Sequence, residues 1–267
     1  SVYWIISLCF LLSFLIVVSL TPFLIHWAHK YSLFDKPDER KIHQENIPRL
    51  GGVALFVAFF ISGIVSLILS QESSFHDFRY FFFVIIIFFI GLKDDFSPVD
   101  TTKKFFVLIV VISCSILWLG FSLTSFKGVF NLFELNTFFS FFFSLFVILL
   151  FVNAHNFIDG SDGLLTSVSF LSSVSLALIF GINGQILPAI HLASLSAALL
   201  GFMIYNRPNA KIFMGDGGSL SLGYIFAIYS IQFINIPESS QASWLGDPAI
   251  ILALFVVPLI DTLQVFI

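Results

Sequence analysis

The sequence predicts an all-α, polytopic transmembrane helical bundle that forms one integral membrane domain over residues 1–267. Hydrophobic residues make up 58% of the chain and charged residues only 10%, with 37 Phe and a mean hydropathy of +1.02. This apolar content exceeds what a soluble core of this size can bury. The apolar residues also form continuous stretches, most of them near the ~20 residues that cross a bilayer. A membrane β-barrel would instead show short alternating segments.

Nine apolar stretches are expected to form helices, and the third and fifth are the shortest. The first stretch is too long for a signal peptide and has no basic segment before it, so we expect it to be a retained span. The chain begins with Ser and stops inside an apolar stretch, so we expect a fragment that is truncated at both ends. The nine stretches are 2–25, 51–70, 80–92, 105–123, 138–152, 164–181, 185–205, 219–235 and 249–267.

The distribution of basic residues predicts the orientation in the membrane. Helices alternate in direction, and loops rich in Lys and Arg stay in the cytoplasm. Arg79 and Lys127 lie on the opposite face. We therefore expect the loops after the first, third, fifth and seventh stretches to be cytoplasmic. Three of these loops hold ten of the 12 basic residues: Lys30, Lys36, Arg40, Lys41, Arg49, Lys93, Lys103, Lys104, Arg207 and Lys211.

A polar segment, NAHNFIDGSDGLL at 153–165, separates two of the apolar stretches. Asn156, Asp159 and Asp162 recur every three residues, so on a helical turn they would lie along one side. Glycines such as Gly160 let a ligand approach the backbone. Each charge in hydrocarbon costs roughly 2.5 to 3.5 kcal/mol on insertion scales, so these residues must line a wet cavity or an interface. Oxygen ligands beside glycines suit a hard cation and a phosphate, and we interpret the segment as an active site.

Two further acidic motifs fall on the same predicted face. Asp94 and Asp95 follow the third stretch, and neighbouring carboxylates raise the affinity of one for a proton or of the pair for a cation. They could instead be a solvated helix end paired with neighbouring lysines. The segment FMGDGGS at 213–219 places three glycines around Asp216. Its amides can point at an anion while the carboxylate holds a cation, although alone it would be read as an ordinary turn.

Taken together, these three motifs resemble the polyprenyl-phosphate N-acetylhexosamine-1-phosphate transferase family, or glycosyltransferase family 4. Asp35-Lys36-Pro37 and Pro48-Arg49-Leu50-Gly51-Gly52 add to the match. The resemblance is closer to bacterial undecaprenyl-phosphate GlcNAc-1-phosphate transferases than to the muramyl-pentapeptide branch, because Pro98 stands where that branch has Lys. The family's histidine-rich loop after the ninth helix is absent from this chain, and we expect one wall of the sugar pocket to be missing with it.

The resemblance implies transfer of an N-acetylhexosamine-1-phosphate, by default GlcNAc-1-phosphate, from a UDP-sugar to undecaprenyl phosphate. The products would be undecaprenyl-diphosphate-sugar and UMP, in the first step of a cell-surface polysaccharide. The resemblance further implies Mg²⁺, with Mn²⁺ as a substitute, a full fold of ten to eleven helices, a homodimer, and a place in the bacterial inner membrane with no nucleic-acid partner. Another amino sugar or UDP-MurNAc-pentapeptide stays open as the substrate. A cation transporter is the alternative from another class, although its carboxylates would belong near the bilayer midplane.

The resemblance also assigns roles to the acidic residues. Asp216 would bind the metal, with Asn156 as a second ligand. Asp94 and Asp95 would serve the lipid phosphate, and one of them would remove its proton. Asp159 would be a nucleophile or a polar organiser, which leaves a covalent intermediate and a direct displacement both open. Six residues, of which the first would face the nucleotide, are the expected substrate contacts: Asp162, Gly160, Asn206, Lys211, Lys104 and Arg49.

Overall fold

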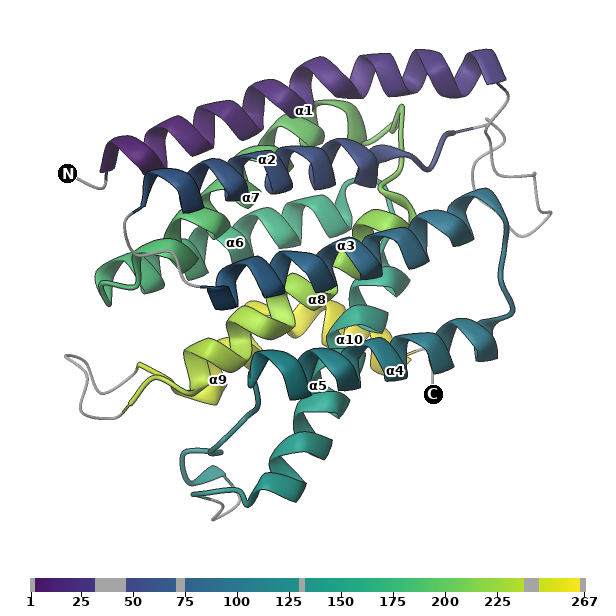
Figure 1. Ribbon diagram of the computed structural model, residues 1–267. Helices are drawn as coiled ribbons and strands as arrows, with labels where there is room; N and C mark the ends of the chain where they lie inside the picture. Colours follow the sequence, from purple (N-terminus) through teal and green to yellow (C-terminus); the bar gives the residue numbers. More distant parts are fainter. Residues whose placement is uncertain (1–2, 32–46, 71–74, 130–132, 238–244, 265–267) are drawn as a thin grey trace.

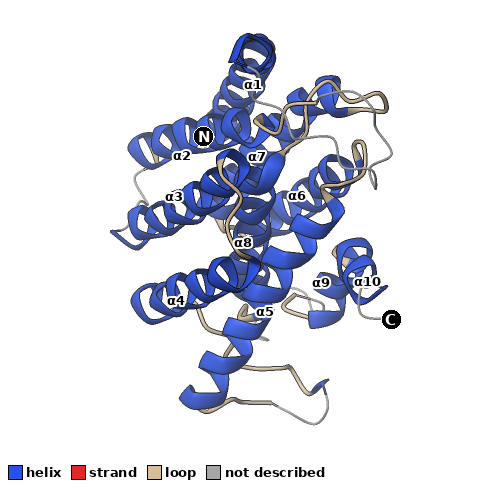
Figure 2. Ribbon diagram, turned by 90° about the vertical axis from the view of Figure 1, so that its right-hand side faces the viewer, coloured by secondary structure: helices blue, strands red, loops and turns tan. Residues whose placement is uncertain are grey.

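A computed structural model describes residues 3–31, 47–70, 75–129, 133–237 and 245–264. Over these residues the chain forms ten α-helices, and its only β-type pairing is an isolated bridge between Ser125 and Glu134. Figure 2 shows these helices joined by loops. Seven of the helices are long and apolar enough to cross a membrane, which confirms the predicted bundle. The helices are α1 (Tyr3–Tyr31), α2 (Gly51–Leu69), α3 (Phe75–Phe96), α4 (Thr101–Leu119), α5 (Thr137–Ile158), α6 (Leu164–Ile182), α7 (Ile186–Asn206), α8 (Gly215–Ile234), α9 (Pro248–Leu254) and α10 (Val256–Gln264).

Helix α8 is the centre of the bundle (Figure 1). Of its most apolar 18 residues, 94% lie inside the protein, and α2, α3, α5 and α6 pack around it. A helix that is apolar on all sides is one that is buried on all sides. The surrounding helices therefore shield α8 from lipid, while its first turn carries Asp216 to the end of the bundle where the polar loops meet.

Glycines allow the backbones around α8 to approach closely. A Cβ added at Gly52 or at Gly91 would lie within 3.0 Å of the backbone of α8, and one added at Gly223 would lie equally close to the backbone of α5. Real Cβ atoms do not reach such distances, so only glycine fits at these three positions. At Gly52 this places the start of α2 directly against the first turns of α8.

The helix ends show that the acidic motifs gather at one end of the bundle, here called the acidic end. This end holds Asp94, Asp95, Asp159 and Asp216, and it lies on the right in Figure 1. Helix α1 runs alongside with 29 residues, a length of about 44 Å at 1.5 Å per residue. That length matches the ~40–45 Å of a bilayer with its headgroups.

Five helices, α1, α3, α4, α5 and α8, extend at least four residues beyond the apolar stretches that predict them. The third and fifth stretches continue into polar residues and become α3 and α5, while α8 begins at Gly215 and not at Ser219. Polar side chains can continue these helices because they leave the hydrocarbon at the acidic end and find hydrogen-bond partners there. Residues 153–158 are therefore the end of α5, and the helix stops before Asp159.

The single helix predicted over 249–267 is wrong, because the chain breaks there into α9 and α10. Pro258 has no N–H to donate to the carbonyl oxygen of Leu254, four residues earlier. Ser172 Oγ of α6 donates to that oxygen instead, at 3.1 Å. At the break the ring of Phe255 is fully buried and packs against Phe226 of α8. Residues 265–267 lie outside the described part of the chain.

Candidate active site

The first turn of α8 points three consecutive N–H groups at two carboxylates. Asp95 accepts with Oδ1 from the N–H of Asp216 at 2.8 Å and with Oδ2 from that of Gly217 at 2.9 Å. Asp159 Oδ2 accepts from the N–H of Gly215 at 2.8 Å. The first N–H groups of a helix lack partners within it and carry partial positive charge. These amides therefore face carboxylates of the protein itself, and a contact of this turn with a substrate anion stays a prediction.

Asp94 and Asp216 meet at one ammonium group. Lys104 Nζ pairs with Asp94 Oδ2 at 2.9 Å and also with Asp216 Oδ2. The remaining oxygen of Asp94 accepts from the N–H of Val99 at 2.6 Å. The side chains of Lys104, Asp94 and Asp216 are 14%, 17% and 19% exposed. Asp94 is therefore no freely solvated helix end, because it binds Lys104 from the next helix.

Asn156 fixes the orientation of Asp216. Its Nδ2 donates to Asp216 Oδ1 and to Ser219 Oγ, both at 3.0 Å. Asn156 therefore presents its amide nitrogen to the carboxylate, and its predicted role as a second metal ligand stays a prediction. Ser219 was not singled out from the sequence. The sequence did contain a signal for it: Ser219 follows Asp216 by three residues, and on a helix this spacing puts both side chains on the same face.

The segment that precedes α2 pairs with the segment that precedes α8. The N–H groups of Gly51 and Gly52 donate to the carbonyl oxygens of Phe213 at 2.9 Å and Met214 at 2.7 Å. The N–H of Phe213 donates in return to Pro48 at 2.9 Å. These three backbone bonds hold the two motifs side by side, since each supplies partners for the polar backbone groups of the other.

Gly215 and Arg49 complete this connection. Gly215 has a φ of +77°, and a Cβ there would collide with the carbonyl oxygen of Arg49. The Arg49 side chain is exposed, and its positive charge is near enough to lower the pKa of both Asp95 and Asp159. Arg49 is thus brought to the acidic cluster, as predicted, although its contact with a substrate stays a prediction.

Asp162 and Asn206 hold the loop that leads from α7 to α8. Asp162 Oδ2 accepts from the backbone N–H groups of residues 209 and 210 at 3.2 and 3.4 Å. Asn206 is 4% exposed, accepts from Thr166 Oγ1 at 2.5 Å and donates to the carbonyl oxygen of Ile212 at 2.9 Å. The structure therefore gives Asn206 the role of joining α6 to this loop, in place of the predicted substrate contact. The nucleotide contact of Asp162 stays a prediction.

Two predicted substrate contacts lie on the surface near these groups. Gly160 is exposed, with no atom within 4 Å of a Cβ built there, so a ligand has room above it. Lys211 is exposed at the loop that Asp162 holds. The Asp35-Lys36-Pro37 motif lies outside the described residues. The structure thus assembles all four predicted aspartates of the acidic end with Asn156, Lys104 and Arg49, and leaves Lys211 at the margin.

The two carboxylates that cap α8 differ electrostatically from ordinary aspartates. Burial raises the pKa of Asp95 to about 7, and the negative charge of Asp216 acts in the same direction. Burial also raises the pKa of Asp159 well above its ordinary value, helped by the charges of Asp95 and Asp216. Hydrogen bonds from the α8 amides oppose both shifts. This region therefore holds more negative charge than it can stabilise alone, which favours binding of a cation.

In metal-free protein we expect the unfolding temperature to fall as the pH rises from about 5 to 8. In an unfolded chain an Asp side chain has a pKa of ~3.9, whereas burial in the folded protein raises the pKa of Asp95 to about 7. Between these two pH values the folded protein therefore binds more protons than the unfolded chain, and this proton binding stabilises the fold. The stabilisation is complete below the pKa that Asp95 has in the unfolded chain, and it is lost as the pH rises through the pKa that Asp95 has in the folded protein. Differential scanning fluorimetry in detergent with EDTA measures the slope; Asp95→Asn should flatten it, and an unchanged slope in that variant would contradict the assignment.

The oxygen atoms at the acidic end suit a magnesium ion. Mg²⁺ prefers oxygen ligands, keeps several waters, and is held by one or two carboxylates together with substrate phosphates. Asp94 Oδ2 and Asp216 Oδ2 both contact a single ammonium group, so one cation can reach both. Among the described residues no three His, Cys, Asp or Glu side chains form a metal cluster. The arrangement thus fits an ion that shares its ligands with a substrate better than an ion in a closed protein site.

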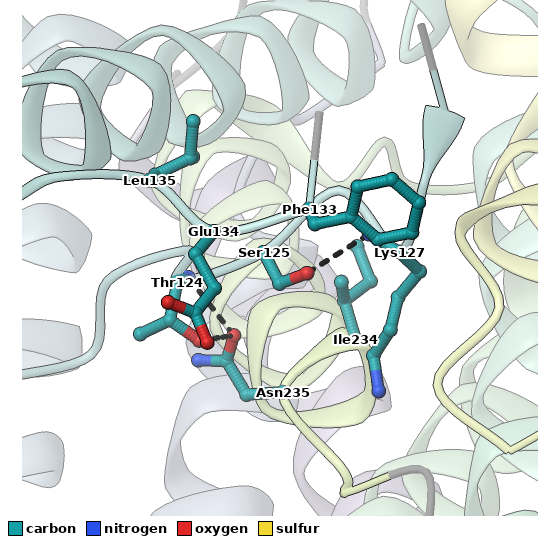
Figure 3. Close-up of a pocket in the computed structure, with 8 residues that line it drawn as sticks. All are labelled: Thr124, Ser125, Lys127, Phe133, Glu134, Leu135, Ile234 and Asn235. Carbon is teal, nitrogen blue, oxygen red and sulfur yellow. Dashed lines mark hydrogen bonds between the residues drawn. The ribbon is translucent and has the colours of Figure 1, made fainter. Parts of the chain in front are cut away.

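A cavity of about 540 Å³, drawn in Figure 3, lies at the last turn of α8, at the opposite end of the bundle from the acidic end. Its polar groups mainly fasten a loop to the last turn of α8. Thr124 donates to Asn235 Oδ1 through its N–H at 3.1 Å and its hydroxyl at 2.9 Å, and Lys127 Nζ donates to the carbonyl oxygen of Ile236 at 2.6 Å. A cation at the C-terminal end of a helix is favourable. This structural role accounts for the polar residues around the cavity. We therefore locate the chemistry at the acidic end.

The fold and the acidic end define a class: a helical membrane protein that gathers carboxylates, an ammonium group and a helix N-terminus at one end of its bundle. The sequence profile of the family described as Glycosyl transferase family 4 matches residues 78–234. The chain therefore belongs to this family, which confirms the resemblance found in the sequence.

Named relatives agree with this assignment. The chain is 32% identical to a probable undecaprenyl-phosphate N-acetylglucosaminyl 1-phosphate transferase of Bacillus subtilis, over 96% of this chain and 70% of the relative. It is 30% identical to an undecaprenyl-phosphate alpha-N-acetylglucosaminyl 1-phosphate transferase of Thermotoga maritima, over 86% of this chain and 67% of the relative. A phospho-N-acetylmuramoyl-pentapeptide-transferase of Listeria monocytogenes is also 30% identical, over 86% and 76% of the two chains. All three of these relatives are named as transferases, and the transporter alternative has no support from them.

Proposed function

We propose that this protein transfers an N-acetylhexosamine-1-phosphate, by default GlcNAc-1-phosphate, from a UDP-sugar to undecaprenyl phosphate. The observation that carries the proposal is that Asp94 Oδ2 and Asp216 Oδ2 converge on one positive group, the ammonium of Lys104, beside the N-terminus of α8. Phosphoryl transfer depends mostly on positioning and on neutralising charge, and this arrangement supplies both. Relatives named for the same transfer support the substrate classes.

In the proposed reaction an oxygen of the lipid phosphate attacks the β-phosphorus of the UDP-sugar. The bond from that phosphorus to the oxygen of the α-phosphate breaks, and UMP leaves with the electron pair. Bound Mg²⁺, held by Asp216 and Asp94, would neutralise the diphosphate and the leaving UMP. Asp95 has both oxygens occupied by the amides of α8. Asp94 binds the N–H of Val99 with one oxygen and the cation with the other, so removal of the lipid phosphate's proton by one of these two neighbours stays a prediction.

Direct displacement is the mechanism that the geometry favours. Asp159 Oδ2 accepts from the N–H of Gly215 and the residue is half-buried, so the geometry gives this carboxylate a capping task at the start of α8. Asp159 is better suited to hold the first turn of α8 in place. Its partner in this task is Asp95, which caps the next two amides. The pair would keep Asp216 pointed at the substrates.

The location in the cell follows from the same reasoning. Lys and Arg residues concentrate in the loops of the acidic end, which supports a cytoplasmic position for that end in a bacterial inner membrane. UDP-sugars are then available on the correct side, while undecaprenyl phosphate reaches the site from the bilayer. A homodimer is part of the proposal on the family resemblance alone.

The test is UMP release by the purified protein in detergent, with a panel of UDP-N-acetylhexosamines and with undecaprenyl phosphate and Mg²⁺ present or omitted. We expect release only when lipid and Mg²⁺ are both present, and the preferred nucleotide names the sugar. Omission of the lipid separates the two mechanisms. Direct displacement predicts no UMP, whereas a covalent Asp159 intermediate predicts a burst of one UMP per enzyme.

Two outcomes would contradict the proposal. Folded protein that releases no UMP with any sugar would remove the transferase assignment for this chain. Release that needs no divalent cation, even after treatment with EDTA, would remove the metal from the mechanism and leave the charge neutralisation to Lys104 and Arg49.

A further inference from the structure

Lys104 lies in a position that its own helix does not favour. It belongs to the first turn of α4, which begins at Thr101 after the N-cap Asp100. The N-terminal end of a helix carries partial positive charge and favours anions over cations. Retention of positive charge at the membrane surface explains the exposed neighbour Lys103, but it does not explain why Lys104 is mostly buried. The partners of Lys104 must therefore determine where its ammonium group lies.

Those partners are one carboxylate oxygen on each of two aspartates, Asp94 and Asp216. Asp94 Oδ1 binds the N–H of Val99, and Asp216 Oδ1 binds Asn156, so Oδ2 of each aspartate is left. Lys104 Nζ contacts both of these oxygens. The ammonium group thus occupies the point where a cation held by Asp94 and Asp216 would lie.

Two cations cannot share this position. A divalent ion within contact distance of the same two oxygens would repel the ammonium group strongly in a partly buried site. Lysine is able to leave, because its charge sits on a flexible four-carbon chain. Once released, its three N–H donors would stand beside the ion, where a diphosphate would need them.

We propose that Lys104 is an exchangeable internal counter-ion, which occupies the divalent-cation position between Asp94 and Asp216 and is displaced from it when the ion binds. Without substrate, Lys104 competes with the ion and weakens its binding. When a substrate diphosphate is present, the displaced ammonium group can bind it, and the ion then binds more tightly. This inference rests on the metal site of the proposed function and adds a positioning residue to it.

The test measures Mn²⁺ binding without substrate, so that turnover plays no part. Metal-free protein in detergent is titrated with Mn²⁺, and the free ion is measured by electron paramagnetic resonance. We expect Lys104→Gln to bind Mn²⁺ about ten-fold more tightly than the unchanged protein, as loss of two competing ion pairs predicts. Lys104→Arg keeps a competing positive charge and should stay close to the unchanged protein. Added UDP should tighten Mn²⁺ binding more in the unchanged protein than in Lys104→Gln.

Each outcome decides the question. Unchanged or weaker Mn²⁺ binding by Lys104→Gln would overturn the proposal. A Lys104→Gln variant that folds only with Mn²⁺ would support it, because ion and lysine then replace each other, whereas one that stays unfolded even with Mn²⁺ would overturn it. Asp216→Asn tests the underlying metal site: Mn²⁺ binding that survives this change would refute the metal site of the proposed function, independently of Lys104.

Discussion

Replacing Asp216 with Ala is expected to lower Mg²⁺-dependent UMP release by about 10³-fold, the usual loss when a group that stabilises transition-state charge is removed. The side chain of Asp216 provides one of the two oxygens that converge on the cation position. Its backbone N–H, which Asp95 caps, is untouched by the substitution. The variant should therefore fold while it loses turnover. The measurement is the initial rate of UMP release over a range of Mg²⁺ concentrations.

Asp100 provides the matched control for this experiment. It is an exposed aspartate at the same end of the bundle, and it caps α4 by accepting from the N–H groups of Thr102 at 3.1 Å and Lys103 at 3.2 Å. Asp100→Ala should cost about 1 kcal/mol of stability as a lost N-cap and leave the rate within a few-fold. Equal losses of rate in the two variants would mean that general negative charge, and not the position of Asp216, governs the reaction.

Replacing Gly91 with Ala is expected to remove nearly all activity and to destabilise the bundle by at least the ~1–3 kcal/mol typical of an overpacked core. The added Cβ would collide with the backbone of Asp216 and Gly217. Backbone cannot rotate away as a side chain can, so α3 and α8 must separate. That separation would pull Asp95 from the amides that it caps. Unfolding temperature and the rate of UMP release should fall together.

Gly181→Ala is the control for this prediction. Gly181 also lies in a helix, α6, but a Cβ there would meet only the side chain of Ala189 at 3.8 Å, an ordinary contact. Alanine also favours the helix over glycine by about 1 kcal/mol. The variant should be as stable as the unchanged protein or more so. If Gly91→Ala behaved in the same way, the close approach of α3 to α8 would not be required for the site.

The sequence was sufficient to predict the bundle because transmembrane stretches are long and uniformly apolar. It was insufficient at the last stretch, where Pro258 leaves the hydropathy unchanged but removes the hydrogen bond to Leu254. The boundaries of α3, α5 and α8 were also misplaced. Hydropathy identifies residues that prefer hydrocarbon, whereas a helix continues until its backbone bonds end, as at Ile158.

The residue types and the common face of the candidate site could be predicted, but its division of labour could not. Asp94 and Asp95 are adjacent in sequence, yet one binds Lys104 and the other caps α8. The pairing depends on how three helices pack, which no local pattern contains. Asn206 illustrates the same limit, because a polar residue in a polar loop is indistinguishable in sequence from one that is buried beneath it.

The central position of α8 has a consequence for the synthesis of the protein. The ribosome makes Asp94, Asp95 and Asp159 well before Gly215. Until α8 emerges and inserts among its neighbours, the capping carboxylates have no α8 amides to bind, and Asp216 is not yet beside Asp94 and the Lys104 ammonium group. An incompletely translated chain that ends before α8 therefore cannot bring these groups together. The acidic end is therefore assembled only when α8 enters the bundle.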